Sequence, residues 1–303
     1  MSGAVERLAE ALGSRARRNE PLASYTNMRV GGPADLLLVC HSNEELVAAV
    51  RLAIEYGVPW LVLGGGCNVL VADAGVRGLV LIDRADAVRM DEDGCLQAEA
   101  GAPLSRLAVE MAEAGWGGLE WAAGLPGTVG GAVVGNAGAF GGDMARVLEG
   151  VTLLERDGST CERPAAWMEL AYRESRIKRL PPAERPVLLT ASMRLQRGER
   201  QILKARITEI LEWRRTRHPG GATMGSTFKN APDAHAGRLI EGVGLKGYRI
   251  GGVKVSELHA NFLINTGNAT AADVLALIEH IQAEVDRRLG VRLEPEVEMV
   301  GEW

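Results

Sequence analysis

The chain has 303 residues, with 34 basic and 39 acidic side chains and a formal net charge of -5, and this length favours two domains, with three as the alternative. Because there is no basic excess, bulk electrostatics cannot hold a nucleic-acid backbone, so any phosphate must be bound by local contacts. Its four cysteines (Cys40, Cys67, Cys95, Cys161) share no metal-binding spacing, and neither a signal peptide nor a spanning helix is evident. We therefore expect a cytoplasmic protein with reduced thiols, no nucleic-acid or membrane partner and no metal.

Hydrophobic periodicity along the chain predicts helices and short strands in irregular alternation. Helices are expected over residues 4–12, 44–57, 104–114, 200–218, 234–244 and 270–290, and strand-like runs over 34–40, 60–63, 69–83, 96–100, 150–158, 186–198 and 248–267. Ser42 with Glu45 predicts a capping box at the second helix, and Thr270 predicts an N-cap for the last. Breakers at residues 218–221 form the strongest candidate boundary between domains. This order of elements predicts an α+β protein.

Glycine is concentrated in "GGGCN" (64–68) and in "GLPGTVGGAVVGNAG" (124–138). Because glycine weakens helices and strands, this density indicates a need for bare backbone. The first segment leads into another strand-like run instead of a helix, and no GxGxxG or GK[ST] motif occurs. Both common nucleotide-binding arrangements, the Rossmann turn and the P-loop, are therefore disfavoured. The alternative interpretation is that both segments are only tight turns between strands.

Seven motifs follow one another along the chain: "TNMRVGGPAD", "LGGGCNVLV", "GLPGTVGGAVVGNAGAFG", "YRESRIK", "GSTFKN", "AGRLIEGVGLKGYRIGGVKVSELHANFLIN" and "LEPEVEMVG". Together they resemble the UDP-N-acetylenolpyruvoylglucosamine reductase family over residues 25–301. The resemblance implies an FAD-binding domain of the vanillyl-alcohol-oxidase (PCMH) type over residues 1–199, with subdomains over 1–64 and 65–199. A C-terminal α+β substrate-binding domain would occupy residues 200–303, and a return of the last few residues to the FAD domain stays an open alternative.

The activity that this resemblance implies is reduction of the enolpyruvyl group of UDP-N-acetylglucosamine enolpyruvate to UDP-N-acetylmuramate, for peptidoglycan synthesis. FAD would be bound non-covalently and NADPH would be the hydride donor. Backbone N–H groups of the two glycine segments would approach the dinucleotide and hold its diphosphate without cationic side chains. The residues expected to bind FAD are Gly64, Gly65, Gly66, Cys67, Asn68, Gly124, Thr128, Gly130, Gly131, Asn136 and Gly138.

Three residues match the catalytic positions of the family. Arg173 would hold the enolpyruvyl carboxylate, because a guanidinium offers a fixed fork of donors to a carboxylate or enolate. Ser226 would donate the proton that follows hydride addition, and Glu296 would orient a water or act as a general acid. Without the motifs, Arg173 would be read as a surface arginine and Ser226 as a turn residue. Glu294 and Glu298 lie at strand spacing from Glu296 and are alternatives to it.

The same motifs also imply which residues contact the substrate. Lys229 and Asn230 are expected to contact the nucleotide sugar, and Tyr248 and Arg249 to lie near the substrate cleft. The chain passes from the strand over 186–198 directly into a helix, without an inserted tyrosine loop, so it resembles the shorter subtype of the family. Small molecules are the expected partners, a monomer is the expected state, and the histidines show no metal-ligand spacing.

Two other functions stay open at this point. An FAD oxidase of the same fold is one, although no residue for covalent flavin attachment is evident. A UDP-sugar sensor with a degenerate flavin site is the other, and the arginine, serine and glutamate of the motifs argue against it.

Overall fold

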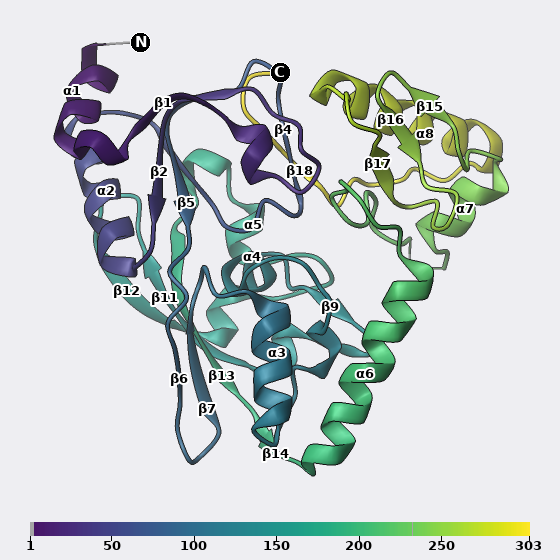
Figure 1. Ribbon diagram of the computed structural model, residues 1–303, viewed down its shortest axis with the longest axis horizontal. Helices are drawn as coiled ribbons and strands as arrows, with labels where there is room; N and C mark the ends of the chain where they lie inside the picture. Colours follow the sequence, from purple (N-terminus) through teal and green to yellow (C-terminus); the bar gives the residue numbers. More distant parts are fainter. Residues whose placement is uncertain (1–2, 232) are drawn as a thin grey trace. The chain divides into compact units, whose positions relative to one another are not determined.

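A computed structural model describes residues 3–231 and 233–303 of the chain (Figure 1). The chain divides into two compact units. Unit 1 comprises the residues up to Arg17, Leu37–Gly65 and Leu79–Arg214, and unit 2 comprises Arg18–Leu36, Gly66–Gly78 and Arg215–Trp303. Both units are therefore discontinuous in sequence.

The helices and strands are those marked in Figure 1. The helices are α1 (Gly3–Leu12), α2 (Asn43–Glu55), α3 (Leu104–Glu113), α4 (Val129–Val134), α5 (Arg176–Arg179), α6 (Arg200–Arg217), α7 (Ala236–Gly242) and α8 (Ala271–Leu289). The strands are β1 (Arg17–Pro21), β2 (Pro33–Cys40), β3 (Trp60–Leu63), β4 (Val69–Val71), β5 (Val76–Asp83), β6 (Val88–Met90), β7 (Cys95–Glu99), β8 (Trp116–Gly117), β9 (Gly138–Ala139), β10 (Gly142–Asp143), β11 (Leu148–Leu154), β12 (Thr160–Pro164), β13 (Val187–Arg194), β14 (Gln196–Arg197), β15 (Arg249–Ile250), β16 (Val253–Val255), β17 (Leu263–Asn265) and β18 (Glu298–Val300).

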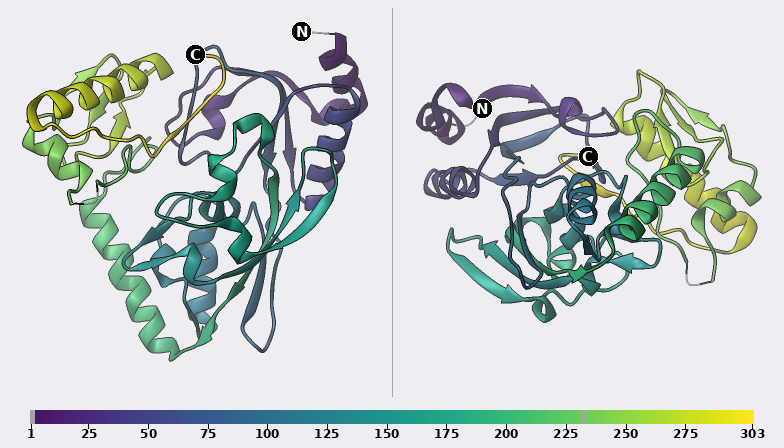
Figure 2. Two further views of the ribbon diagram at one scale, coloured as in Figure 1. Left: turned by 180° about the vertical axis from the view of Figure 1, so that it is seen from behind. Right: turned by 60° about the horizontal axis from the view of Figure 1, so that its bottom comes forward.

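Unit 1 is built on a five-stranded antiparallel sheet of order β12-β11-β13-β7-β6. Helices α3 and α4 lie on one face of this sheet (Figures 1 and 2). Apolar residues recur on the buried faces of these strands and helices, as half-buried elements require. The core that they form includes Leu96, Ala98, Leu107, Val133, Leu153 and Met193, and α6 adds Leu203, Ile207 and Ile210.

A second sheet has the order β1-β2-β5-β3. Within unit 1, β3 runs parallel to β5, and the paired residues run from Trp60 and Leu79 to Leu63 and Ile82. The nearly continuous apolar run of β5 is buried from Leu79 onward, which is typical of a strand covered on both faces. Helices α1 and α2 pack side by side next to this sheet (Figure 1).

Unit 2 contains the antiparallel sheet β15-β16-β17, packed against α8. Its core draws on α7, α8 and the strands, and includes Phe228, Ile240, Val253, Leu277, Ile278 and Ile281. The last strand, β18, pairs in parallel with β4, and Glu298 lies opposite Val69. This pairing joins two segments that are more than two hundred residues apart in sequence.

Most predicted helices and strands are confirmed. Of the two predicted helix caps, the structure forms one in full and the other in part. At α8 the Thr270 side chain accepts the N–H of Asp273 and the Asp273 carboxylate accepts the N–H of Thr270, a complete capping box. At α2 the Ser42 hydroxyl accepts the N–H of Glu45 at 3.3 Å. The Glu45 carboxylate, however, accepts the N–H of His41 at 2.9 Å, so the second half of the predicted box is wrong.

The glycine segment 124–138 contains the helix α4, which the sequence did not predict. Glycines inside it disfavour a helix by about 1 kcal/mol each, yet the helix packs against β7 and β13. Tertiary packing decides the structure of so short a helix. Thr128 is its N-cap and Gly135 its C-cap.

The last passage of the chain from unit 1 to unit 2 falls between Arg214 and Arg215, close to the breakers at 218–221. Because these units are defined by contacts, the functional domain boundaries at 1–199 and 200–303 stay predictions. In the part of the chain that the structure describes, no helix has both the length and the apolar character needed to cross a bilayer.

Candidate functional site

Arg173 lies in a tight turn of unit 1 in which the backbones of Ala171 and Glu174 bond each other in both directions, at 3.0 and 3.1 Å. Its φ of 57° is the left-handed conformation, which a non-glycine residue adopts only where its surroundings hold it. The guanidinium donates from Nη2 to the carbonyl of Gly138 at 2.9 Å and from Nη1 to that of Asn136 at 3.4 Å. The turn thus fixes the direction of the arginine fork.

Ser175, which sequence reasoning did not single out, anchors this turn. It is fully buried, and its hydroxyl donates to the carbonyl of Val134 at 2.6 Å while accepting the N–H of Lys178 at 3.1 Å. The second contact makes Ser175 the N-cap of α5. A serine directly before a short basic run is the sequence signal that could have revealed it.

The predicted cofactor residues around α4 have tight protein contacts of their own. The N–H of Gly130 donates to the carbonyl of Ala100 at 2.8 Å, and a Cβ on Gly130 would come within 2.8 Å of the Ala100 Cβ. A Cβ on Gly64 would lie 2.5 Å from Thr128 Oγ1. For Gly64 and Gly130, close protein packing is therefore a sufficient reason for glycine.

Gly131 differs from these glycines because it is exposed. A Cβ there would have its nearest neighbour, Thr128 Oγ1, at 3.8 Å. Gly124 is exposed as well, with φ of 69°, and its N–H donates to Ser105 Oγ at 2.7 Å. At Gly131 and Gly124 a ligand can approach the backbone.

Asn136 and Gly138 shape the end of the same segment. The Asn136 amide donates to the carbonyl of Ala171 at 2.8 Å and accepts the N–H of Ala145 at 3.1 Å. A Cβ on Gly138 would lie 2.7 Å from the Cβ of Asp143. Both residues hold the carbonyls that orient Arg173, so the predicted cofactor loop and the predicted catalytic arginine form one structure.

The first glycine segment is anchored at several points. Arg84 donates to the carbonyl of Gly64 at 2.8 Å in unit 1. In unit 2, Gly66 has φ of 62°, and a Cβ there would collide with the carbonyl oxygen of Tyr25. Asn68 donates through Nδ2 to the carbonyl of Glu296 at 3.1 Å. The predicted residues Gly65 and Cys67 are half-buried.

Unit 2 brings Ser226 and Glu296 onto adjoining segments. The N–H of Glu296 donates to the carbonyl of Thr227 at 2.8 Å, and the N–H of Lys229 donates to the carbonyl of Glu294 at 2.9 Å. Ser226 and Glu296 are half-buried, whereas Glu294 is exposed. Two of the three predicted catalytic residues therefore lie one residue apart across a pair of strand-like segments, and the third, Arg173, belongs to unit 1.

Asn261, a further residue that the sequence did not reveal, clamps this segment. Its side chain accepts the N–H of Phe228 at 3.0 Å and donates to the Phe228 carbonyl at 2.9 Å, while its own carbonyl accepts the N–H of Thr227 at 2.8 Å. Nδ1 of His259 accepts the N–H of Asn261 at 3.2 Å. Burial lowers the pKa of His259, so burial and this contact both favour the neutral imidazole.

Of the four predicted substrate residues, Lys229 is half-buried and the other three are exposed, and each has a local partner. Lys229 Nζ pairs with Glu294 at 2.6 Å, and Asn230 accepts the N–H of Ala236 at 3.0 Å. Tyr248 stacks on His280 with 4.5 Å between ring centroids, and Arg249 donates to Thr266 Oγ1 at 2.9 Å. These contacts fix the side chains, and contact with substrate stays a prediction.

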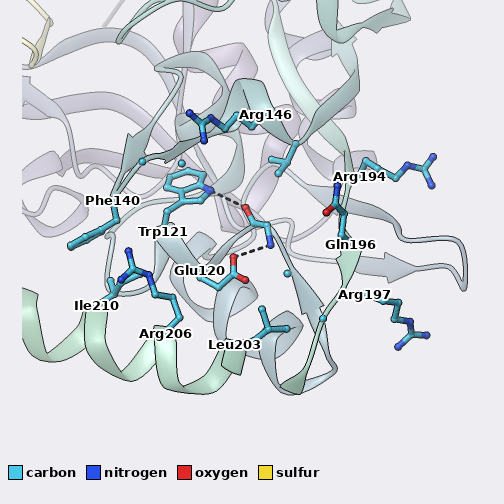
Figure 3. A pocket seen from close by; sticks show the side chains of 16 residues that line it. Glu120, Trp121, Phe140, Arg146, Arg194, Gln196, Arg197, Leu203, Arg206 and Ile210 are labelled. Atoms are coloured by element: carbon cyan, nitrogen blue, oxygen red, sulfur yellow. Dashed lines mark hydrogen bonds between the residues drawn. The ribbon is translucent and has the colours of Figure 1, made fainter. Parts of the chain in front are cut away.

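An open cavity of about 620 Å³ lies in unit 1 beside α6 (Figure 3). Its wall includes Trp121, Phe140, Arg206 and Ile210. Glu120 accepts the N–H of Gly118 at 2.8 Å within it. Among residues 3–231 and 233–303, no group of three or more His, Cys, Asp or Glu side chains could hold a metal ion.

Residues 34–162 match the family model of an FAD-binding domain, and residues 217–300 match that of the UDP-N-acetylenolpyruvoylglucosamine reductase C-terminal domain. A UDP-N-acetylenolpyruvoylglucosamine reductase of Rubrobacter xylanophilus is 46% identical over 302 residues, covering 99% of each chain. The chain belongs to the UDP-N-acetylenolpyruvoylglucosamine reductase family.

Other members of the reductase family agree with this assignment. The protein of that name from Chloroflexus aggregans is 41% identical and covers 97% of this chain and all of its own length. The crystal structure of UDP-N-acetylenolpyruvylglucosamine reductase from Thermus caldophilus has a TM-score of 0.80 at 36% identity, covering 94% of this chain and 98% of that one. The predicted family, the α+β fold with an FAD-binding domain, and the class of FAD-dependent oxidoreductase are thereby confirmed.

The residues of unit 1 fit an FAD-type ligand at two places. Gly131 and Gly124 present exposed backbone, and a buried arginine, Arg214, packs beside Gly124 with no carboxylate of the described residues against it. An anionic dinucleotide needs close backbone approach and compensating positive charge, and both are present here.

Proposed function

We propose that this member of the reductase family reduces the enolpyruvyl group of UDP-N-acetylglucosamine enolpyruvate to UDP-N-acetylmuramate, for peptidoglycan synthesis, with NADPH as the hydride donor. The observation that carries the proposal is the pairing in unit 2, where the Glu296 N–H donates to the Thr227 carbonyl beside Ser226. The segments that carry Ser226 and Glu296 thus adjoin, in a chain that matches the reductase family throughout.

Bound FAD supplies the hydride chemistry, and the protein supplies binding, orientation and charge. The cofactor would be held non-covalently by the two glycine segments, with Gly131 and Gly124 as the positions of closest backbone approach. The other predicted cofactor residues, such as Gly130 and Asn136, would act by shaping the segment, because they are buried and their polar groups bond to protein.

Arg173 would bind the carboxylate of the enolpyruvyl group. Hydride addition to the methylene carbon leaves negative charge on the carbon next to that carboxylate, and a guanidinium held in advance stabilises it without reorganisation. The two carbonyl contacts of Arg173 and its enforced φ supply that fixed orientation.

Ser226 would complete the reaction by donating its hydroxyl proton to that carbon. An isolated hydroxyl is a weak acid, so a neighbouring group must stabilise the alkoxide that it leaves. Glu296 on the adjoining segment is the candidate to orient a water or to act as an acid in its place. Lys229, Asn230, Tyr248 and Arg249 would contact the substrate.

Anaerobic stopped-flow spectroscopy tests this function. The purified chain should be yellow, NADPH should bleach the flavin, and UDP-N-acetylglucosamine enolpyruvate should restore the oxidised spectrum. Parallel reduction with NADH measures the preference between the two donors. A colourless protein that does not take up FAD, or a reduced flavin that the enolpyruvyl substrate fails to reoxidise, contradicts the proposal.

The expected setting of this activity is the cytoplasm, with small molecules as partners. A monomer is the expected state, and sedimentation should give a mass near 32.3 kDa.

A further inference from the structure

Arg214 is a buried cation in the last turns of α6. Its exposed fraction is 9%, and its one hydrogen bond within residues 3–231 and 233–303 is a long contact of 3.5 Å from Nη2 to the carbonyl of Trp121. Its Nε is buried and has no hydrogen-bond partner in the described part of the chain. Burial alone lowers the pKa of Arg214, with no carboxylate acting on it, and an arginine stays protonated in proteins.

An unpaired buried guanidinium is costly to the folded chain. A protein interior stabilises such a charge poorly, and replacing it by an apolar side chain of similar size is often neutral or stabilising. Arg206, another arginine of the same helix, shows the ordinary arrangement. Its side chain is 42% exposed and pairs with Glu209 at 2.6 Å. The Arg214 guanidinium, by contrast, meets only the Trp121 carbonyl and the Phe140 ring among the described residues and has no anionic partner there, which points to a ligand outside the chain.

Arg214 packs beside Gly124 of the glycine segment and beside the ring of Phe140 just after that segment. A Cβ on Gly124 would lie 3.0 Å from the Arg214 Cδ, and the Arg214 guanidinium lies 5.2 Å from the ring centre of Phe140. Trp213 meets the same ring edge to face at 5.1 Å. Phe140 has φ of 49°, a strained conformation for a bulky residue. These contacts hold Arg214 next to exposed backbone at Gly124.

The open cavity beside α6 begins about one helical turn from Arg214. Ile210 lines it, and Arg214 lies four residues later on the same face of α6. Figure 3 shows Phe140 and Arg206 at this edge of the cavity, next to α6. The cavity therefore lies about one helical turn from Arg214 within unit 1.

We infer that Arg214 is held unpaired to receive a phosphate group of a nucleotide ligand at the Gly124 end of the glycine segment. A guanidinium is the side chain best suited to a phosphate, because its fork donates two parallel hydrogen bonds. Three ligands of the proposed function carry this chemistry, namely FAD, NADPH and the UDP-sugar. FAD is the expected source, since residues 34–162 match an FAD-binding domain.

The test compares the full chain, stripped of flavin, with the variants Arg214→Met and Arg206→Met. FAD affinity, measured by quenching of flavin fluorescence, should fall about 10- to 100-fold in Arg214→Met, the effect of losing a charged hydrogen-bonded pair. Arg206→Met is the matched control, because it removes an exposed, paired arginine beside the same aromatic ring, and it should bind FAD as the wild type does. Arg214→Lys should be intermediate, since it keeps the charge and loses the fork.

Thermal unfolding of the flavin-free chains separates this inference from a structural role. Arg214→Met should unfold at the same temperature as the wild type or at a higher one, because a buried charge has been removed. Inorganic pyrophosphate should raise the unfolding temperature of the wild type and have little effect on Arg214→Met. A marked drop in the unfolding temperature of both Met and Lys variants would show that Arg214 only supports the fold.

To identify the ligand, the affinities of the wild type and of Arg214→Met are also measured for UDP and for NADP⁺. A selective loss of UDP or NADP⁺ binding in Arg214→Met would assign the phosphate to that ligand instead. Equal affinity of wild type and Arg214→Met for FAD, UDP and NADP⁺ overturns the inference while leaving the proposed function intact. Failure of the wild type itself to bind FAD contradicts the proposed function on which the expected source rests.

Discussion

Ser226 and Thr227 are neighbouring hydroxyl residues in different environments. Ser226 is half-buried next to the segment that carries Glu296, whereas Thr227 is fully buried and its Oγ1 has no hydrogen-bond partner among the described residues. A proton donor has to be reachable by substrate, whereas a buried hydroxyl without a partner costs folding free energy. The pair therefore offers a catalytic variant and its control one residue apart.

Replacing Ser226 by Ala should spare flavin reduction by NADPH, because no carbanion is formed in that half-reaction. Reoxidation by the enolpyruvyl substrate should slow by about 100-fold or more, the usual effect of losing a positioned acid. Stopped-flow absorbance separates the two half-reactions. Thr227→Val should leave both rates unchanged. If Ser226→Ala is reoxidised at the wild-type rate, another group must donate the proton, and Glu296 is the next candidate.

Asp83, at the end of β5, is a buried acid whose pKa is raised in the folded chain. It is 3% exposed, and burial raises its pKa from 3.8 to about 6 in spite of the N–H that Ala85 donates to it. Because the folded pKa lies above the unfolded one, the stability that protonated Asp83 contributes is complete below about pH 4 and is lost as the pH rises through 6.

The variant Asp83→Asn should therefore match the wild type near pH 4 and exceed its free energy of unfolding at pH 8, by at most about 3 kcal/mol for a shift of two pKa units. Urea unfolding at the two pH values measures the difference. Asp157→Asn is the control with opposite sign, since the hydroxyl and N–H of Ser159 lower the pKa of that exposed carboxylate. A gain at pH 8 in both variants would show that general charge, not burial, is responsible.

At the scale of elements, the capping box of α8 tests how far the longest helix of unit 2 depends on its first turn. Thr270→Ala removes the acceptor of the Asp273 N–H and should cost about 1 kcal/mol of folding free energy. Thr208→Ala in the middle of α6 removes a hydroxyl bonded only to the Lys204 carbonyl and should change stability by a few tenths of a kcal/mol at most. Denaturant midpoints give both values, and equal effects would mean that the cap contributes little.

Gly66 and Gly131 show two different reasons for glycine, strain in a tight backbone and close approach of a ligand. At Gly66 a Cβ would collide with the carbonyl of Tyr25 and φ is positive, so Gly66→Ala should destabilise the chain by more than about 1 kcal/mol. At Gly131, which is exposed within α4, alanine should instead stabilise the flavin-free chain by up to about 1 kcal/mol.

The same Gly131→Ala variant should bind FAD more weakly, because its methyl group would stand where the ligand approaches the backbone. Fluorescence titration of FAD measures this effect beside the denaturant midpoint. Unchanged FAD affinity would leave Gly131 as a helix residue without a role in binding the cofactor.

At the scale of the whole molecule, the strand β18 pairs with β4 and so joins the last residues of unit 2 to a segment early in the chain. The N–H of Glu298 donates to the Asn68 carbonyl at 3.1 Å, and the N–H of Ala72 donates to the Val300 carbonyl at 2.9 Å. Deleting residues 298–303 should lower the unfolding temperature and slow reoxidation by substrate, because it frees the segment that carries Glu296. Deleting the exposed Trp303 alone should change neither. Thermal unfolding and stopped-flow traces of the two truncations check this.

Sequence patterns predicted the long helices and the family, because these follow from local periodicity and from motifs in register. The helix α4 escaped prediction, since its glycines disfavour a helix and only its packing against β7 and β13 forms it. Ser226 and Glu296 could be named from motifs, but not their adjacency, which arises from hydrogen bonds between distant segments. Arg214 carried no signal at all, because an arginine's lack of a partner is a property of the folded chain.

The contact between Asn68 and Glu296 joins residues that are 228 positions apart. On a ribosome that adds about 10 residues per second, the first of them would wait on the order of 20 s for the second. During that interval β4 is a strand without its neighbour, and an unpaired strand edge invites association with other nascent chains. A chaperone can protect β4 during this interval, and the contact of Asn68 with Glu296 forms only after both residues have been translated.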